Sequence, residues 1–407
     1  MTWTDRFRRI LPWVATSLFG CLHFQPIDRP LSDDISERAA IIDRAQHHGM
    51  SRREELVVTK VLLATHGEDL MRLKRLIEHG PDRSTLHELI YQQISDDVLR
   101  QAILAHLVRE SRSELTPPSH PPREKVRVLS DIDDTLYSSL CDERFRRRTL
   151  FPGVLEFYRA LSVGVRAHDS SVQAKGDVTF LSARPRELAS LSYSSTLNPL
   201  FAAHSSIIGG YSLLPAPRAY SGIGNVHEVQ AFAKFRNFVQ YAALYPEADF
   251  VFIGDSGQGD LLSGELMLYH QPERLRAVFI HQIVTGQSHG MFCPYPRSVK
   301  DMDQGISHLV FFDTYVGAAL QAFEWGLISE ESLLAVAQAT VRTLNQRGTE
   351  IVNPPHRSLV VGQFRRDLRR AQEVLDRQND SPRERLPELL FGDSACSAGT
   401  SPSAPSP

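Results

Sequence analysis

Several features that mark particular protein classes are scarce in this 407-residue chain. Its four cysteines stand far apart, at positions 21, 141, 293 and 396, without a CxxC pair. This spacing argues against a structural zinc site and a dense disulfide framework, and it favours a reducing compartment. The formal net charge of -3 supplies no basic excess to neutralise a phosphate backbone, so no nucleic-acid partner is expected. The 16 histidines, including those of HHGM, show no spacing that predicts a metal site.

Long apolar runs are also missing. The stretch ILPWVATSLFGCLHF follows Arg6, Arg8 and Arg9, but it is too short to cross a hydrocarbon core of ~30 Å as a helix. Three interpretations of residues 1–31 remain open: a targeting signal, a membrane-surface helix, or a helix packed on the protein. Asp5 interrupts the basic start and favours the packed helix. We therefore expect a cytoplasmic protein, with peripheral membrane association as the alternative.

What the chain does have is the composition of a globular protein, with 42% hydrophobic and 23% charged residues. Residues 32–115 repeat apolar side chains at spacings of three and four, which predicts a helical domain. The Pro-rich stretch at 116–124 predicts a linker. A second, larger domain is expected at 125–315 and further helices at 316–380. The Ser/Pro-rich end, 381–407, predicts a disordered tail.

Short apolar runs alternate with helical patterns after the linker. The runs expected to be strands are VRVLS (126–130), DVTFLS (177–182), SSIIGG (205–210), DFVFIG (249–254) and LRAVFI (275–280). The segments expected to be helical are VLEFYRALSV, PRELASLSYSSTL, HEVQAFAKFRNFVQYAAL, FFDTYVGAALQAFEWGLI, SEESLLAVAQATVRTLNQRG and SLVVGQFRRDLRRAQEVLDRQ. This alternation predicts an α/β fold with a doubly wound parallel sheet, whose ligand site lies beyond the carboxyl ends of the strands.

Two groups of acids follow two of these strands. Asp131, Asp133 and Asp134 come directly after the first, and Asp255 and Asp260 lie at the end of the fourth. Both strand ends are expected at one edge of the sheet, where the carboxylates would repel one another unless a cation lay between them. Oxygen ligands in this number suit Mg2+, which commonly takes phosphate oxygens as further ligands. The pattern therefore predicts phosphate chemistry.

A DxD pair alone is as typical of a turn or a helix cap. Here it is followed in order by Thr135, a strand ending at Ser182, the helical Lys234, and GDSGQGD. This set resembles the haloacid dehalogenase-like (HAD) phosphohydrolases. SDIDDT, FPGVLEFYRAL and GDSGQGD more narrowly resemble the catalytic domain of App1-type phosphatidate phosphatases, relatives of the lipins, over about residues 126–285. The resemblance implies a HAD-like Rossmannoid fold and hydrolysis of a phosphate monoester.

The resemblance also implies roles for individual residues. Asp131 is the expected nucleophile, which forms an aspartyl-phosphate. Asp133 is the expected general acid and base, and its backbone carbonyl an expected Mg2+ ligand, together with Asp131 and Asp255. Ser182 and Lys234 are expected to contact the phosphoryl group, and Lys234 is the only lysine between Lys175 and Asp255. Supporting roles, in the loop, beside the metal or on the phosphate, are expected for Asp134, Thr135, Arg184 and Asp260.

The spans between the predicted strands leave no room for a cap domain, and an uncapped site favours a large or interfacial substrate. Arg144, Arg146, Arg147 and Arg148 either touch an anionic membrane surface or form a solvated turn. LSARPREL and the LLSGE after GDSGQGD depart from the App1 pattern. Three functions therefore stay open: hydrolysis of phosphatidate or a related lipid phosphate, hydrolysis of a phosphoprotein or soluble phosphate ester, and noncatalytic lipid binding or scaffolding.

Overall fold

The computed structural model describes most of the chain. The described residues are 32–46, 50–78, 85–113, 126–139, 141–164, 178–183, 205–208, 226–284, 308–377 and 386–392. Residues 1–31, the predicted linker at 116–124, the predicted helix PRELASLSYSSTL and most of the predicted tail lie outside these ranges. Expectations about them stay predictions.

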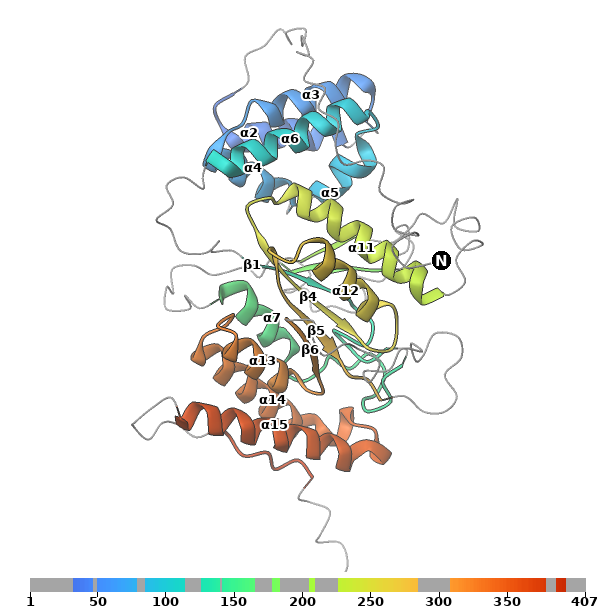
Figure 1. Ribbon diagram of the computed structural model, residues 1–407, viewed down its shortest axis with the longest axis vertical. Coiled ribbons are helices and arrows are strands. Elements are labelled where there is room, and N and C mark those ends of the chain that lie inside the picture. Colours follow the sequence, from blue (N-terminus) through green and yellow to red (C-terminus); the bar gives the residue numbers. More distant parts are fainter. Residues whose placement is uncertain are drawn as a thin grey trace, which may run out of the picture.

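A six-stranded sheet with only parallel pairings forms the centre of the molecule (Figure 1). Its order is β3-β2-β1-β4-β5-β6. The strands are β1 (Val126–Ser130), β2 (Val178–Leu181), β3 (Ser205–Ile208), β4 (Asp249–Asp255), β5 (Leu275–His281) and β6 (Leu309–Phe312). The chain builds outward from β1 to β3 and then returns to the other side of β1, which is the doubly wound arrangement that the sequence predicts.

The sixth strand corrects one expectation. FFDTYVGAALQAFEWGLI was expected to be helical throughout, but its first residues belong to β6, in which Phe311 pairs with Ile280 of β5. The helix begins only at Tyr315, after Thr314 caps it by accepting a hydrogen bond from the Gly317 N–H at 3.1 Å. Pairing with β5 decides the state of this short apolar run, because its pattern fits a helix as well as a strand.

Helices cover both faces of the sheet. One face carries α7 (Val154–Val163), α13 (Tyr315–Glu324), α14 (Glu330–Ile351) and α15 (Arg357–Arg377), with a short 3-10 turn η4 (Pro354–His356) before α15. The other face carries α11 (Val226–Leu244) and α12 (Asp260–His270). Neighbouring residues of β1 face opposite layers: Val128 packs with α7 and α13, and Leu129 with α11.

The N-terminal helices pack on the outer side of α11 (Figure 1). They are α2 (Ile35–Gln46), α3 (Arg52–Leu63), α4 (Gly67–Glu78), α5 (Leu86–Glu88), the π-helical turn η1 (Leu89–Gln93) and α6 (Asp97–Ser113). Their apolar faces and α11 share one hydrophobic cluster. Lys74 Nζ lies 2.8 Å from Glu247 Oε1, and His87 Nε2 lies 2.9 Å from Gln240 Oε1. The predicted helical region is thus tied to the sheet layer by apolar and polar contacts.

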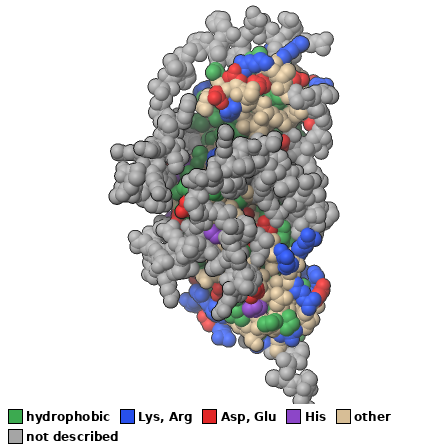
Figure 2. All heavy atoms as spheres, turned by 90° about the vertical axis from the view of Figure 1, so that its right-hand side faces the viewer, with side chains coloured by type: hydrophobic (Ala, Val, Ile, Leu, Met, Phe, Trp, Pro, Cys, Tyr) green, Lys and Arg blue, Asp and Glu red, His purple; other side chains and the backbone are tan. Residues whose placement is uncertain are grey.

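One side of these helices can be seen in the space-filling view. Figure 2 shows basic and acidic side chains interspersed on the described residues at the top of that view. Among the described helices, none combines the length and the apolar character that crossing a bilayer requires.

Candidate active site

Two acids meet where the direction of winding reverses, between β1 and β4. Asp131 directly follows β1, and Asp255 is the last residue of the neighbouring β4. The Asp131 N–H donates to the Ile253 carbonyl at 2.9 Å, which extends the strand pairing by one residue. In doubly wound sheets the crevice beyond the carboxyl ends of the strands at this point is the usual ligand site. The predicted convergence of the two acid groups is therefore seen for Asp131 and Asp255.

Lys234 joins these acids from α11. Its Nζ lies 2.7 Å from Asp131 Oδ1 and also donates to Asp260 Oδ1, at the start of α12. The lysine side chain is only 1% exposed. Burial alone lowers the pKa of this ammonium, but Asp131 and Asp260 raise it above its usual value. Lys234 therefore carries a firmly held positive charge.

A glycine makes this meeting of α11 and α12 possible. A Cβ on Gly259 would lie 2.3 Å from the His227 carbonyl oxygen and 2.8 Å from the Ala231 backbone nitrogen. Only a residue without a side chain permits so close a backbone approach. The approach places Asp260, the next residue, beside Lys234.

The three buried carboxylates Asp131, Asp255 and Asp260 can each offer an oxygen within 4.8 Å of the other two. Lys234 offsets only one of these charges. Burial, opposed by Lys234 but reinforced by Asp260, raises the pKa of Asp131 to about 8. Burial and repulsion from Asp260 and Asp131 also raise the pKa of Asp255 well above its usual range.

Asp255 further has an oxygen that no described residue contacts by a hydrogen bond. Its Oδ1 accepts from the Gly257 N–H at 2.6 Å, while the buried Oδ2 accepts no hydrogen bond from the part of the chain that the structure describes. An unpaired buried carboxylate oxygen is costly unless a cation or water satisfies it. An all-oxygen donor set with excess negative charge fits a hard divalent cation.

The loop after β1 is held by Asp134. Its carboxylate accepts backbone N–H bonds from Ser139 at 2.8 Å, Cys141 at 2.7 Å and Asp142 at 3.2 Å. Asp134 has a φ of +54°, a left-handed conformation that is uncommon for a residue with a side chain. These three bonds close the loop on itself, so Asp134 stabilises the loop in which Asp133 lies.

Asp133 and Thr135 differ in their contacts. Asp133 Oδ1 accepts from the Ser139 hydroxyl at 2.5 Å, which orients the carboxyl group. The Thr135 hydroxyl is buried without a hydrogen-bond partner among the described residues, and its backbone carbonyl accepts from the Tyr315 hydroxyl at 2.5 Å. Within the described part of the loop, the Thr135 side chain therefore forms no hydrogen bond.

The remaining expected residues lie near β2. Ser182 follows β2, the other neighbour of β1, and its N–H donates to the Ile208 carbonyl at 2.9 Å. It is buried at the same edge of the sheet as Asp131. Arg184 lies outside the described residues.

A second buried network lies beneath the loop, and no motif in the sequence predicted it. The Arg144 guanidinium donates to the Asp142 carboxylate and to Gln363 Oε1 of α15, at 3.0 Å. His281 Nε2 lies 2.8 Å from Arg144 Nη2, and His281 Nδ1 donates to the Asp134 carbonyl at 2.9 Å. Because Arg144 is 1% exposed, it neither touches a membrane surface nor belongs to a solvated turn, the two interpretations left open for the basic stretch. Of the basic stretch, Arg146, Arg147 and Arg148 are exposed.

Cys141, in the same loop, is disulfide-bonded. The wide cysteine spacing did not predict this bond.

Fold and site together define a doubly wound α/β protein with a buried acid cluster at the winding reversal. Residues 126–282 match the family described as "Phosphatidate phosphatase APP1, catalytic domain". The match runs from β1 to the residue after β5 and includes all the residues expected in the site. It confirms the resemblance to App1-type catalytic domains over this part of the chain. No curated protein and no solved structure matches the chain significantly.

Proposed function

We propose that this protein is a Mg2+-dependent phosphomonoesterase with a HAD-like catalytic domain, which hydrolyses phosphatidate to diacylglycerol and phosphate. The observation that carries this proposal is the position of Asp131. A carboxylate at the winding reversal, held by a buried lysine and flanked by two further acids, suits attack on a phosphoryl group. The match of residues 126–282 to a phosphatidate phosphatase domain supports the lipid substrate.

Asp131 and Asp133 divide the chemistry between them. An Asp131 oxygen attacks phosphorus while the bond from phosphorus to the leaving oxygen breaks, and Asp133 gives that oxygen its proton. Asp133, now a carboxylate, takes a proton from water as the water oxygen attacks the aspartyl-phosphate. Phosphate leaves, and Asp131 is again a carboxylate. The hydrogen bond from Ser139 to Asp133 Oδ1 keeps one carboxyl oxygen occupied and so orients the other.

The other residues supply charge and position. Lys234 stabilises the ionised form of Asp131 and offsets the charge of the transferring group. Ser182 donates its hydroxyl to a phosphate oxygen, and Asp260 holds Lys234. Mg2+, held by Asp131, Asp255 and the Asp133 carbonyl, would neutralise charge on the phosphoryl oxygens.

Basic residues near the candidate nucleophile bear on the substrate class. The exposed Arg146, Arg147 and Arg148 follow the loop of the candidate nucleophile and suit an anionic lipid surface. A phosphoprotein or soluble phosphate ester is the alternative for the same chemistry. A third possibility is a noncatalytic lipid-binding or scaffold protein with the same fold.

The decisive experiment measures phosphate release from phosphatidate in mixed micelles and from p-nitrophenyl phosphate, each with and without Mg2+. Wild type is compared with Asp131→Asn and with Asp249→Asn, which changes a buried acid at the opposite end of β4. We expect Mg2+-dependent release from the lipid that Asp131→Asn lowers on the order of 10⁴-fold with the fold retained, whereas Asp249→Asn stays active.

The other outcomes separate the alternatives. Release only from the soluble ester would keep the mechanism and discard the lipid. Near-normal turnover in a folded Asp131→Asn protein would refute the nucleophile. If no phosphate is released from a broad panel of phosphate esters while the protein still binds vesicles, the lipid-binding function is favoured.

A further inference from the structure

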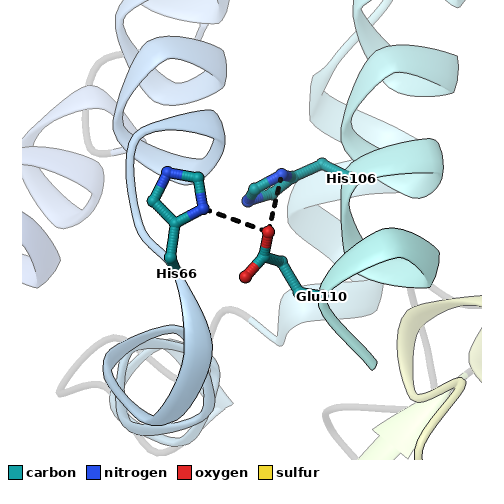
Figure 3. Close-up of side chains that lie close together, drawn as sticks. All are labelled: His66, His106 and Glu110. Atoms are coloured by element: carbon teal, nitrogen blue, oxygen red, sulfur yellow. Dashed lines mark hydrogen bonds and ion pairs between the residues drawn. The ribbon is translucent and has the colours of Figure 1, made fainter. Parts of the chain in front are cut away.

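A second cluster of potential metal ligands lies in the N-terminal helices, outside the segment that matches the phosphatase family. His66 stands directly before α4, and His106 and Glu110 lie one turn apart on α6 (Figure 3). Each can offer a ligand atom within 4.8 Å of the other two. Residues at positions i and i+4 share one helix face, so His106 and Glu110 both face His66.

The tautomer of His106 is set by the backbone. Its Nε2 lies 2.9 Å from the Thr65 carbonyl oxygen, which can only accept, so Nε2 carries the proton. In the neutral ring, Nδ1 then presents a lone pair, and it lies 3.8 Å from Glu110 Oε1. Two electron-pair donors that face each other repel, and a proton or a metal ion between them relieves that repulsion. A histidine whose second nitrogen donates to a backbone carbonyl has the usual arrangement of a metal-ligating histidine.

Glu110 is also held in place. Its Oε2 accepts from the Gly67 N–H at the start of α4, at 3.0 Å. Its Oε1 lies 3.0 Å from His66 Nδ1 and thus faces both imidazole rings. One oxygen is therefore used to orient the carboxylate, while the other is directed toward the two histidines.

Exposure differs across the cluster in a way that suits ion entry. The His106 side chain is 3% exposed and that of Glu110 16%, whereas that of His66 is 65% exposed. The inner two ligands are fixed by the fold, and the outer one can adjust to an ion by a side-chain rotation.

We propose that His66, His106 and Glu110 bind a divalent transition-metal ion, most simply Zn2+, which joins the α3–α4 turn to α6. Two imidazole nitrogens and one carboxylate oxygen, with water completing the coordination, are a donor set that suits Zn2+ better than Mg2+. The site is chemically distinct from the all-oxygen cluster at Asp131. It is independent of the proposed phosphatase activity.

The alternative to a metal site is a simple ion pair between His66 and Glu110. A metal titration on the full chain separates the two. Wild type, His66→Ala and His356→Ala are stripped with a chelator, returned to buffer with excess Mg2+ to occupy hard-oxygen sites, and titrated with Co2+ and then Zn2+. His356 is the matched control, because it lies 3.8 Å from Glu143 as a single histidine paired with one acid.

We expect wild type and His356→Ala to bind one equivalent more than His66→Ala, with Co2+ absorption bands in the visible that Zn2+ removes. Zn2+ should also raise the Tm of wild type and of the control more than that of His66→Ala. Glu110→Gln provides a second variant, whose affinity for Zn2+ should fall at least about tenfold. Equal stoichiometry and equal Tm shifts in wild type and His66→Ala would overturn the proposal.

Discussion

The acid cluster at the sheet edge and the His66–His106–Glu110 cluster each gather three ligand-bearing side chains, yet they differ in what keeps them together. Asp131, Asp255 and Asp260 are buried and depend on Lys234 for countercharge. The histidine cluster opens to solvent at His66. Water can screen charge in the second cluster but not in the first. Burial therefore decides how much each cluster costs when one partner is lost, and the following predictions test that difference.

The largest effect is expected for Lys234→Met. Removal of the ammonium leaves three buried carboxylates without their protein counterion, which costs about 3–5 kcal/mol of unfolding free energy and abolishes phosphatase activity. Lys74→Met is the matched control, because Lys74 is also 1% exposed and ion-paired but lies away from the acid cluster. Urea unfolding and turnover are measured for both. A Lys234→Met protein as stable as wild type would show that burial does not make this cluster depend on its lysine.

Gly259→Ala should have the next largest effect. The added Cβ would collide with the backbone of α11 and push the start of α12 away, which moves Asp260 from Lys234. We expect a loss of about 2 kcal/mol and a lower turnover number. Gly362→Ala is the control: Gly362 is exposed within α15, and a Cβ there meets nothing within 4 Å. That change should leave turnover intact and stabilise the protein slightly.

A third prediction compares a buried with an exposed histidine in the same helical region. Burial lowers the pKa of His87 from 6.5 to about 4. Below pH 6.5 the unfolded chain binds a proton at this ring that the folded chain does not bind until about pH 4. Unfolding free energy should therefore fall as pH drops through this window, by up to about 1.4 kcal/mol per pH unit from this group.

Urea unfolding at neutral and mildly acidic pH checks this expectation. His87→Gln should remove that share of the pH dependence, whereas His66→Ala should leave it unchanged. The same slope in all three proteins would mean that His87 titrates in the folded state as it does in the unfolded chain.

The smallest effect is expected for His66→Ala in chelator. The ion pair with Glu110 is largely exposed on the histidine side, so its loss should change unfolding free energy by less than about 1 kcal/mol. Addition of Zn2+ should increase the difference in stability between wild type and His66→Ala. Thermal unfolding with and without the metal measures both differences. A large loss of stability in chelator would show that His66 contributes as much as a buried charged group.

Much of the fold was predictable because its strands are short apolar runs between helical patterns. Five of the six strands and the bounds of α7 follow from that alternation. β6 did not, since LVFF becomes a strand only when β5 offers it an edge. In the site, the order of the acids predicted the convergence of Asp131 and Asp255. The burial of Arg144 was not predicted, because a basic residue in a charged stretch is usually exposed. The sequence does not show that Asp142, His281 and Gln363 surround it.

The sequence by itself determined which chemical groups are available and on which strand ends they stand, because strand periodicity and the parallel sheet depend on local patterns of apolar side chains. Only the tertiary structure decided which groups meet. It brings Lys234 to Asp131 and Asp260 through the close approach of α11 and α12, and it brings His66 to the face of α6 that carries His106 and Glu110. Both meetings join residues far apart in the chain, where helix packing sets distances that no local spacing contains.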